Sequence, residues 1–211
     1  MATPTTIDND TELSAVNSIL GSIGQSPVTT LNFTNPETEF IYNILTEVSK
    51  DVQNEGWQFN LEENVTVTPS SNKISVGNQE IRVNIHSHAN QAKLMDTVIR
   101  YDGANRRVYS LDENKFDAFT ESTYKCDIVT LYLFEKIPNV FQRYITYRAA
   151  VRAATQLIAN PQLVQLLQLQ EVTARANCLE YEGRQGDHSF FGLPNAKRLH
   201  SQILARNSAS G

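Results

Sequence analysis

The chain has 211 residues, of which 40% are hydrophobic and 19% are charged, and it carries a formal net charge of −5. That length allows one domain or two small ones, with enough residues to bury a core. The acidic balance argues against a tight nucleic-acid binder, because such a protein needs clustered Lys and Arg to displace counterions.

Three other features concern the compartment and the membrane. The two cysteines, Cys126 and Cys178, do not make a disulfide framework and favour a reducing compartment. No signal peptide is expected, because residues 1–12 lack a basic segment followed by an apolar one. The longest uncharged run, residues 153–170, contains five Gln, one Asn and one Pro, which argues against a membrane span.

Two helices are predicted near the start of the chain. Asp10 or Thr11 is expected to cap the first helix, which stops at Gly24. Asn35-Pro36 begins the second, which stops at Gly56. Apolar residues recur in both at spacings of three and four, so each helix has one apolar face.

The pattern then changes to alternation of apolar and polar residues. Residues 57–136 are expected to form an inserted β domain of short antiparallel strands. The first alternating run starts at Trp57 and Phe59, and the last is Ile128–Phe134. Between them, Asp102-Gly103 is a strong hairpin signal.

Two longer helices are predicted from Pro138 to Glu182. Asn160-Pro161 separates them, with Asn160 as N-cap, and Gly183 is expected to end the second as a C′ glycine. The predicted class is therefore α+β. Its antiparallel helical bundle (10–56 and 137–183) carries the inserted β domain (57–136) and is followed by an extended C-terminal tail (184–211).

The tail combines basic and apolar residues, which is more typical of a docking segment than of a spacer; a frayed terminus is the alternative. The residues predicted to dock are Phe190, Phe191, Leu193, Lys197 and Arg198.

The last two helices also carry a candidate subunit-packing surface. Small or neutral residues recur there, and a helix that is apolar on more than one side usually packs against more than its own domain. The residues are Ala149, Ala150, Ala153, Gln162, Gln165 and Gln168. A solvated neutral face is the alternative for the glutamines.

No catalytic, metal or cofactor site is predicted. His86 and His88 would share one face of a strand, but a catalytic zinc needs a third ligand, and none is near in sequence. Adjacent carboxylates such as Glu62-Glu63 point to opposite faces of a strand, whereas a glycan hydrolase needs two that face one cleft. The chain contains no P-loop, GxGxxG or GxSxG motif.

Several stretches in the same order carry a family resemblance, and their number matters more than any one of them. They are Glu12–Val28, Gly56–Asn60 (GWQFN), Leu61–Glu63, Val65–Pro69, Arg100–Gly103, Ile128–Phe134, Ile137–Ile145 and Cys178–Glu182. Together they resemble the tail tubular protein A family, the head-to-tail adaptors, or gatekeepers, of podoviruses, the short-tailed bacteriophages. The resemblance covers residues 10–185 and is least over 70–95 and 186–211.

The resemblance implies a ring, typically a dodecamer, under the portal protein. The helical bundle would pack around the channel and the β domain would face outward and downward. The ring would join the portal to the tail nozzle protein, with tail fibres near that joint. Genomic DNA would pass through without sequence-specific binding.

The leading hypothesis is therefore a structural virion protein of the tail or neck, assembled in the host cytoplasm, with no membrane contact and no chemistry of its own. It would form part of the DNA ejection channel, with the C-terminal tail ordering on the portal. One rival hypothesis is a tail-associated cell-wall glycan hydrolase. The other is a monomeric, host-derived α+β binding module.

Overall fold

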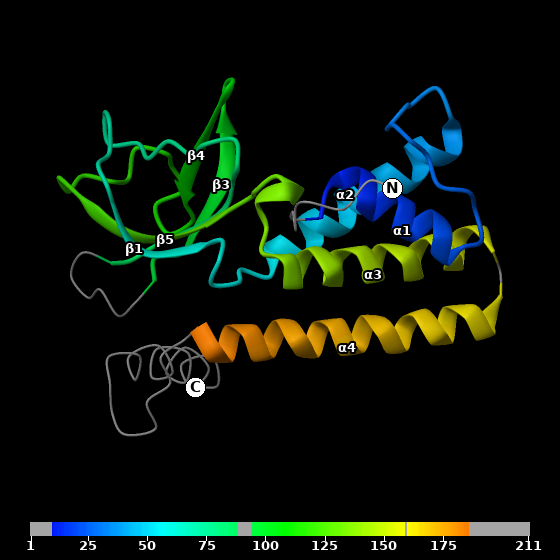
Figure 1. Ribbon diagram of the computed structural model, residues 1–211. Helices are drawn as coiled ribbons and strands as arrows, with labels where there is room; N and C mark the ends of the chain where they lie inside the picture. Colours follow the sequence, from blue (N-terminus) through cyan, green and yellow to red (C-terminus); the bar gives the residue numbers. More distant parts are fainter. Residues whose placement is uncertain (1–9, 88–93, 159, 186–211) are drawn as a thin grey trace, which may run out of the picture. The chain divides into compact units, whose positions relative to one another are not determined.

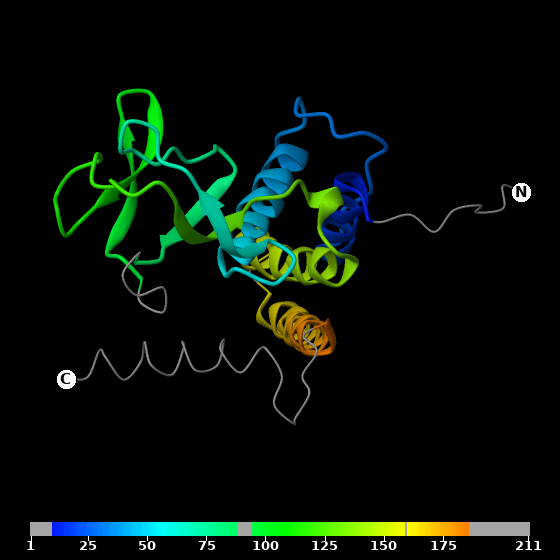
Figure 2. The same ribbon diagram turned by 90° about the vertical axis from the view of Figure 1, so that its left-hand side faces the viewer.

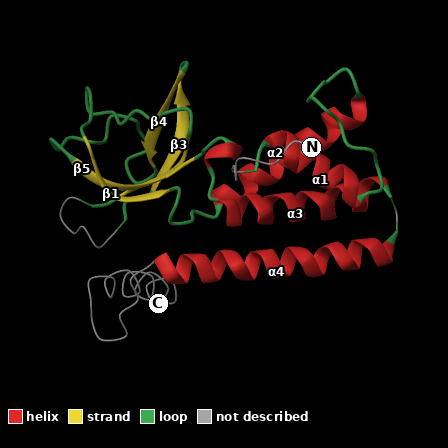
Figure 3. Cartoon of the chain, viewed as in Figure 1, coloured by secondary structure: helices red, strands yellow, loops and turns green. Residues whose placement is uncertain are grey.

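A computed structural model of the protein describes residues 10–87, 94–158 and 160–185 (Figure 1). It contains four α-helices and five strands among these residues, which confirms the predicted α+β class (Figure 3). Contacts divide the chain into a helical unit, residues 1–60 and 130–179, and a sheet unit, residues 61–129 and 180–211. No helix in the described ranges is both long and apolar enough to cross a lipid bilayer.

The first two helices begin where the capping residues predict. Helix α1 spans Glu12–Ser22, and Thr11 forms a capping box with Ser14. Helix α2 spans Pro36–Asn54, and the Asn35 side chain accepts a hydrogen bond from the Glu37 N–H. Each cap satisfies a backbone donor that has no partner within the helix.

Helix α3 spans Asn139–Leu157 and helix α4 spans Pro161–Gln185. The Asn160 side chain accepts from the N–H groups of Gln162 and Leu163, at 3.1 and 3.3 Å, which confirms the predicted cap. Helix α4 runs back along α3, and α3 lies between α4 and the α1–α2 pair in both views (Figures 1 and 2).

The core of the helical unit comes from the apolar faces of α1, α2 and α3. Its fully buried members include Val16, Ile19, Ile41, Leu45, Phe141, Tyr144 and Ile145. These positions recur at three and four residues along each helix, so the sequence periodicity located this core correctly.

The sheet unit contains two small sheets. Strands β1 (Leu61–Val67), β5 (Tyr124–Thr130) and β2 (Glu80–Ile85) form one in the order β1-β5-β2, and β1 pairs antiparallel with β5. Strands β3 (Thr97–Asp102) and β4 (Asn105–Ser110) form the predicted antiparallel hairpin. Gly103 has φ +62° in its turn, a backbone conformation that glycine adopts without strain.

The core of the sheet unit is apolar and joins residues from both sheets to the segments between them. Its buried members are Ile74, Val76, Val83, Ile85, Val108, Phe119, Tyr124, Cys126 and Ile128.

Two predictions about strands were wrong. Residues Trp57–Asn60 form a turn instead of a strand, because the Trp57 ring is buried in the helical unit, 4.9 Å from the Phe141 ring. The last alternating run is a strand only up to Thr130, and Phe134–Lys136 then forms a 3₁₀ helix with Phe134 buried. Alternation over a few residues does not distinguish a strand from a turn whose aromatic residues enter a helical core.

The predicted end of the fourth helix was also wrong. Helix α4 continues through Gly183 to Gln185. Glu180 and Arg184 are one turn apart and form an ion pair of 2.5 Å across this stretch, a spacing that stabilises helices.

Candidate functional site

Helix α4 is apolar on two opposite sides. On the inner side, Leu167, Ala174 and Cys178 are buried, and the Cys178 thiol lies 3.5 Å from the Val140 carbonyl oxygen of α3. The outer side carries an outer stripe, defined as Leu166, Leu169, Val172 and Leu179, whose members are 61%, 66%, 67% and 56% exposed. At 3.6 residues per turn the two sets lie about half a turn apart. The helix therefore buries side chains on only one of its two apolar sides.

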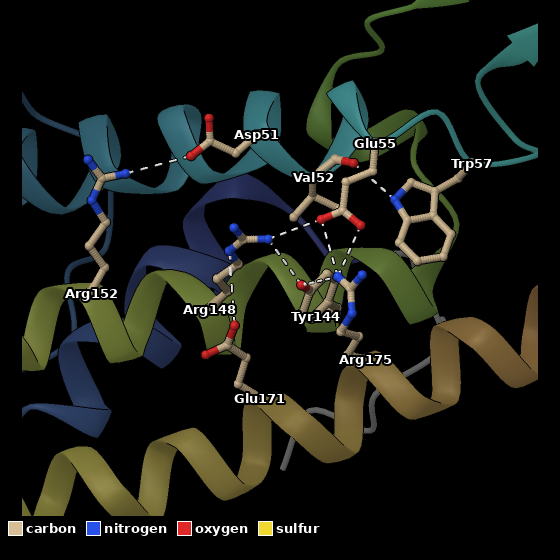
Figure 4. Close-up of polar contacts among 9 residues, drawn as sticks. All are labelled: Asp51, Val52, Glu55, Trp57, Tyr144, Arg148, Arg152, Glu171 and Arg175. Atoms are coloured by element: carbon tan, nitrogen blue, oxygen red, sulfur yellow. Dashed lines mark hydrogen bonds and ion pairs between the residues drawn. The ribbon is translucent and has the colours of Figure 1, made fainter. Parts of the chain in front are cut away.

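A polar cluster links α4 to the C-terminal end of α2 and to the middle of α3, and Figure 4 shows its members pointing toward one another. Arg175 of α4 donates to both carboxylate oxygens of Glu55, at 3.2 and 3.0 Å, and to the Tyr144 hydroxyl at 2.8 Å. Arg148 of α3 donates to the same carboxylate at 3.2 Å and to the same hydroxyl at 3.1 Å. We call these four residues the Glu55 cluster.

The cluster is supported by rings and by one further carboxylate. The Arg175 guanidinium lies 5.7 Å from the Trp57 ring centroid and 5.6 Å from that of Tyr144, within cation–π range. The Trp57 indole N–H donates to the Val52 carbonyl at 2.9 Å, which fixes the ring. Glu171 of α4 lies 4.0 Å from Arg148.

The electrostatics favour the charged guanidinium groups. The hydrogen bond to the Tyr144 hydroxyl raises the pKa of Arg175 most, burial opposes this increase, and the Glu55 carboxylate adds to it. For Arg148, burial opposes the charged form most, yet Tyr144 and Glu55 together raise its pKa. The side chains of Glu55 and Arg175 are 31% and 44% exposed, so water screens the pair and each link contributes only about 0.2–1 kcal/mol.

A groove of about 540 Å³ lies between α3 and α4. Its lining residues are Asn139, Val140, Arg143 and Tyr147 of α3 with Leu169, Gln170, Thr173, Ala174 and Asn177 of α4. This lining has no carboxylate among the residues that the structure describes, so the groove lacks the acid pair of a glycan hydrolase.

The residues predicted to pack between subunits fall into two groups. Gln162, Gln165 and Gln168 are exposed on α4, where their spacing places them beside the outer stripe. Ala149, Ala150 and Ala153 are buried in the helical unit, where small side chains let helices approach closely. Packing against a second copy stays a prediction for both groups. The predicted docking residues of the tail, Phe190, Phe191, Leu193, Lys197 and Arg198, lie outside the described residues.

Of the two histidines considered as metal ligands, the structure describes His86. His86 lies 3.1 Å from the Asp127 carboxylate, and His88 is outside the described residues. Within the described ranges, no group of three or more His, Cys, Asp or Glu side chains is placed to hold a metal ion.

Sequence reasoning missed the Glu55 cluster, although one local signal was available. Arg148 and Arg175 each stand between uncharged residues, and the nearest charge on the same helix is four residues away. An isolated Arg in such a stretch needs a partner when it is partly buried. The partner, Glu55, is 93 and 120 residues away, and no local pattern identifies it.

Comparison with known families gives a match that covers most of the chain. Residues 13–188 match the family model described as Tube, tail tubular protein. A search of curated proteins finds no match. The chain therefore belongs to the tail tubular protein family, and it is a structural protein of the bacteriophage tail.

Proposed function

We propose that this tail protein is a head-to-tail adaptor. In this role, copies of the chain form a ring, a dodecamer in the family that the sequence resembles, between the portal protein and the tail nozzle protein. The ring forms part of the channel through which genomic DNA is ejected, and tail fibres attach near its lower joint. Assembly takes place in the host cytoplasm, and the chain performs no reaction itself.

The observation that carries this proposal is the outer stripe of α4 in a chain of a tail family. Four large apolar side chains that are more than half exposed indicate a protein that functions within an assembly. The acidic balance of the chain agrees with a conduit, because each contact of a cation with a phosphate would slow DNA passage.

The carboxylates give no support to the alternative of a cell-wall hydrolase. Glu62 and Glu63 are consecutive and exposed on β1, and Glu180 is paired with Arg184. None of them lines the groove between α3 and α4.

The adaptor proposal is tested by the molecular mass in solution, measured by light scattering with and without portal rings. We expect a large complex of defined stoichiometry when the portal is present, and nozzle protein should bind to that complex but not to the portal alone. A chain that remains at 23.7 kDa with the portal and leaves the nozzle unbound would contradict the adaptor role. Release of soluble fragments from purified peptidoglycan would favour the hydrolase instead.

A further inference from the structure

We infer that the outer stripe of α4 is the surface on which a second copy of this chain docks. This inference rests on the proposed assembly into a ring and names the residues that hold neighbouring copies together. The stripe members Leu166, Leu169 and Val172 follow one another at three residues, and Leu179 continues the same side two turns later. They form one continuous apolar strip along the helix.

The strip is not a by-product of packing within the chain. The inner side of α4, with Leu167, Ala174 and Cys178, already contacts the chain's own α3. A helix that needed only this contact would be polar on its opposite side. The opposite side of α4 instead exposes four large aliphatic side chains, each 56–67% accessible.

The charge distribution identifies the occupant as an identical chain. Residues 153–170, which include the first ten residues of α4, contain no Asp, Glu, Lys or Arg. Two copies with a net charge of −5 repel each other, so they approach at lowest cost through a surface without charge. An acidic or basic partner would instead be met by charged residues along the whole surface, and the first ten residues of α4 carry none.

The border of the stripe agrees with an interface between copies. Gln162, Gln165 and Gln168 flank it, and their amides can donate and accept hydrogen bonds without adding charge. Interface cores are depleted of charged residues and keep a polar rim. A helix side exposed to water in the same unit differs: α2 exposes Glu47 and Lys50, among other charged residues.

The ring geometry adds a restriction. Two stripes packed against each other would form a closed dimer, whereas a ring needs each stripe to meet a different surface of the next copy. Association through the stripe should therefore continue beyond a dimer.

The test is the double variant Leu166→Ser with Val172→Ser, studied as the full chain by sedimentation velocity over a range of concentrations, alone and with portal rings. Both side chains are exposed, so the fold should be unaffected, and circular dichroism checks this. We expect the dissociation constant between copies to rise more than tenfold. Binding of successive copies to a portal ring should change from cooperative to independent.

The matched control is Leu133→Ser, because Leu133 is 69% exposed and lies outside α4. The control should associate as the wild-type chain does. If copies of the double variant associate as the wild type does, the stripe is not the contact between copies, and the adaptor role is unaffected. A wild-type chain whose copies never associate, alone or on the portal, overturns it as well. A wild-type chain that self-associates through the stripe but ignores the portal supports this inference and contradicts the adaptor role.

Discussion

Two buried amide side chains join residues 53–60 to residues 130–132 at the edge of the helical unit. The Asn60 side chain donates to the carbonyls of Gln53 and Thr130, at 2.8 and 3.1 Å, and accepts from the Trp57 N–H at 2.9 Å. The Gln53 side chain donates to the Tyr132 carbonyl at 3.0 Å and accepts from the N–H of the same residue at 2.7 Å. Asn60 is the last residue of the GWQFN stretch, so these bonds give that stretch a physical role.

At this scale we predict that Asn60→Ala destabilises the protein by about 2–3 kcal/mol. The substitution leaves two carbonyl groups and one N–H without these partners in a buried place, and such groups cost about 1–3 kcal/mol. Urea denaturation followed by circular dichroism measures the change. Asn177→Ala is the control, because Asn177 is exposed on α4 and its replacement should stay within about 0.5 kcal/mol. Equal stability of the two variants would show that the Asn60 amide does not stabilise this connection between the two segments.

At the scale of the element, α4 is held less firmly than the other helices of its unit. It buries three side chains against the unit, and these include the small Ala174 and Cys178. A groove of about 540 Å³ remains beside this contact. The Glu55 cluster supplies the other links, and these are partly exposed to water. We therefore expect α4 to open locally while α1–α3 stay folded, as parts with few buried apolar contacts do.

The corresponding prediction concerns Glu55→Gln, which removes the carboxylate shared by Arg148 and Arg175. Loss of both partly exposed pairs should favour opening by about 1 kcal/mol, so amide hydrogen exchange in residues 161–179 should rise about fivefold. Mass spectrometry of exchanged peptides gives the rates. In 1 M salt, where charges are screened within about 3 Å, the wild-type chain should approach the variant.

Glu47→Gln provides the matched control for this experiment. Glu47 lies on α2, and its ion pair of 2.7 Å is with Arg152 of α3 and not with α4 (Figure 4 shows Arg152 with its other partner, Asp51). Its replacement should leave exchange in α4 unchanged. If α1 and α4 exchanged faster by the same factor in the Glu55 variant, the change would be global and the local opening of α4 would be refuted.

At the scale of the whole molecule, two segments of the sequence differ in charge. The tip of the α3–α4 pair is uncharged, whereas residues 186–211 add Lys197, Arg198 and Arg206 to an otherwise acidic chain. The proposed roles follow this division: the uncharged stripe meets another copy, and the basic, apolar segment docks on the portal.

We predict that a chain ending at Gln185 keeps its fold and its copy-to-copy contact but loses at least tenfold in affinity for portal rings. The described helices and strands end by residue 185, so circular dichroism should retain its helical signal. Binding to immobilised portal rings measures the affinity. The control is the full chain with Leu133→Ser, which should bind as the wild type does. Unchanged portal binding by the shortened chain would disprove the docking role of residues 186–211.

The sequence by itself determined which segments become helices and where the first two begin. Thr11 and Asn35 supply local capping bonds, and apolar residues at three and four positions mark one face of each helix. Asp102-Gly103 likewise determined the β3–β4 hairpin through turn geometry alone. These features depend on neighbours within a few residues, so the order of residues is enough to predict them.

Only the tertiary structure decided which apolar side of α4 stays exposed and which partners the charged residues take. Periodicity shows that α4 has two apolar sides but cannot say which one meets α3. The link from Arg175 to Glu55 spans 120 residues, and the burial of Trp57 against Phe141 turned an expected strand into a turn. Such contacts depend on how distant segments meet in space, and the local spacing of residues carries no information about that.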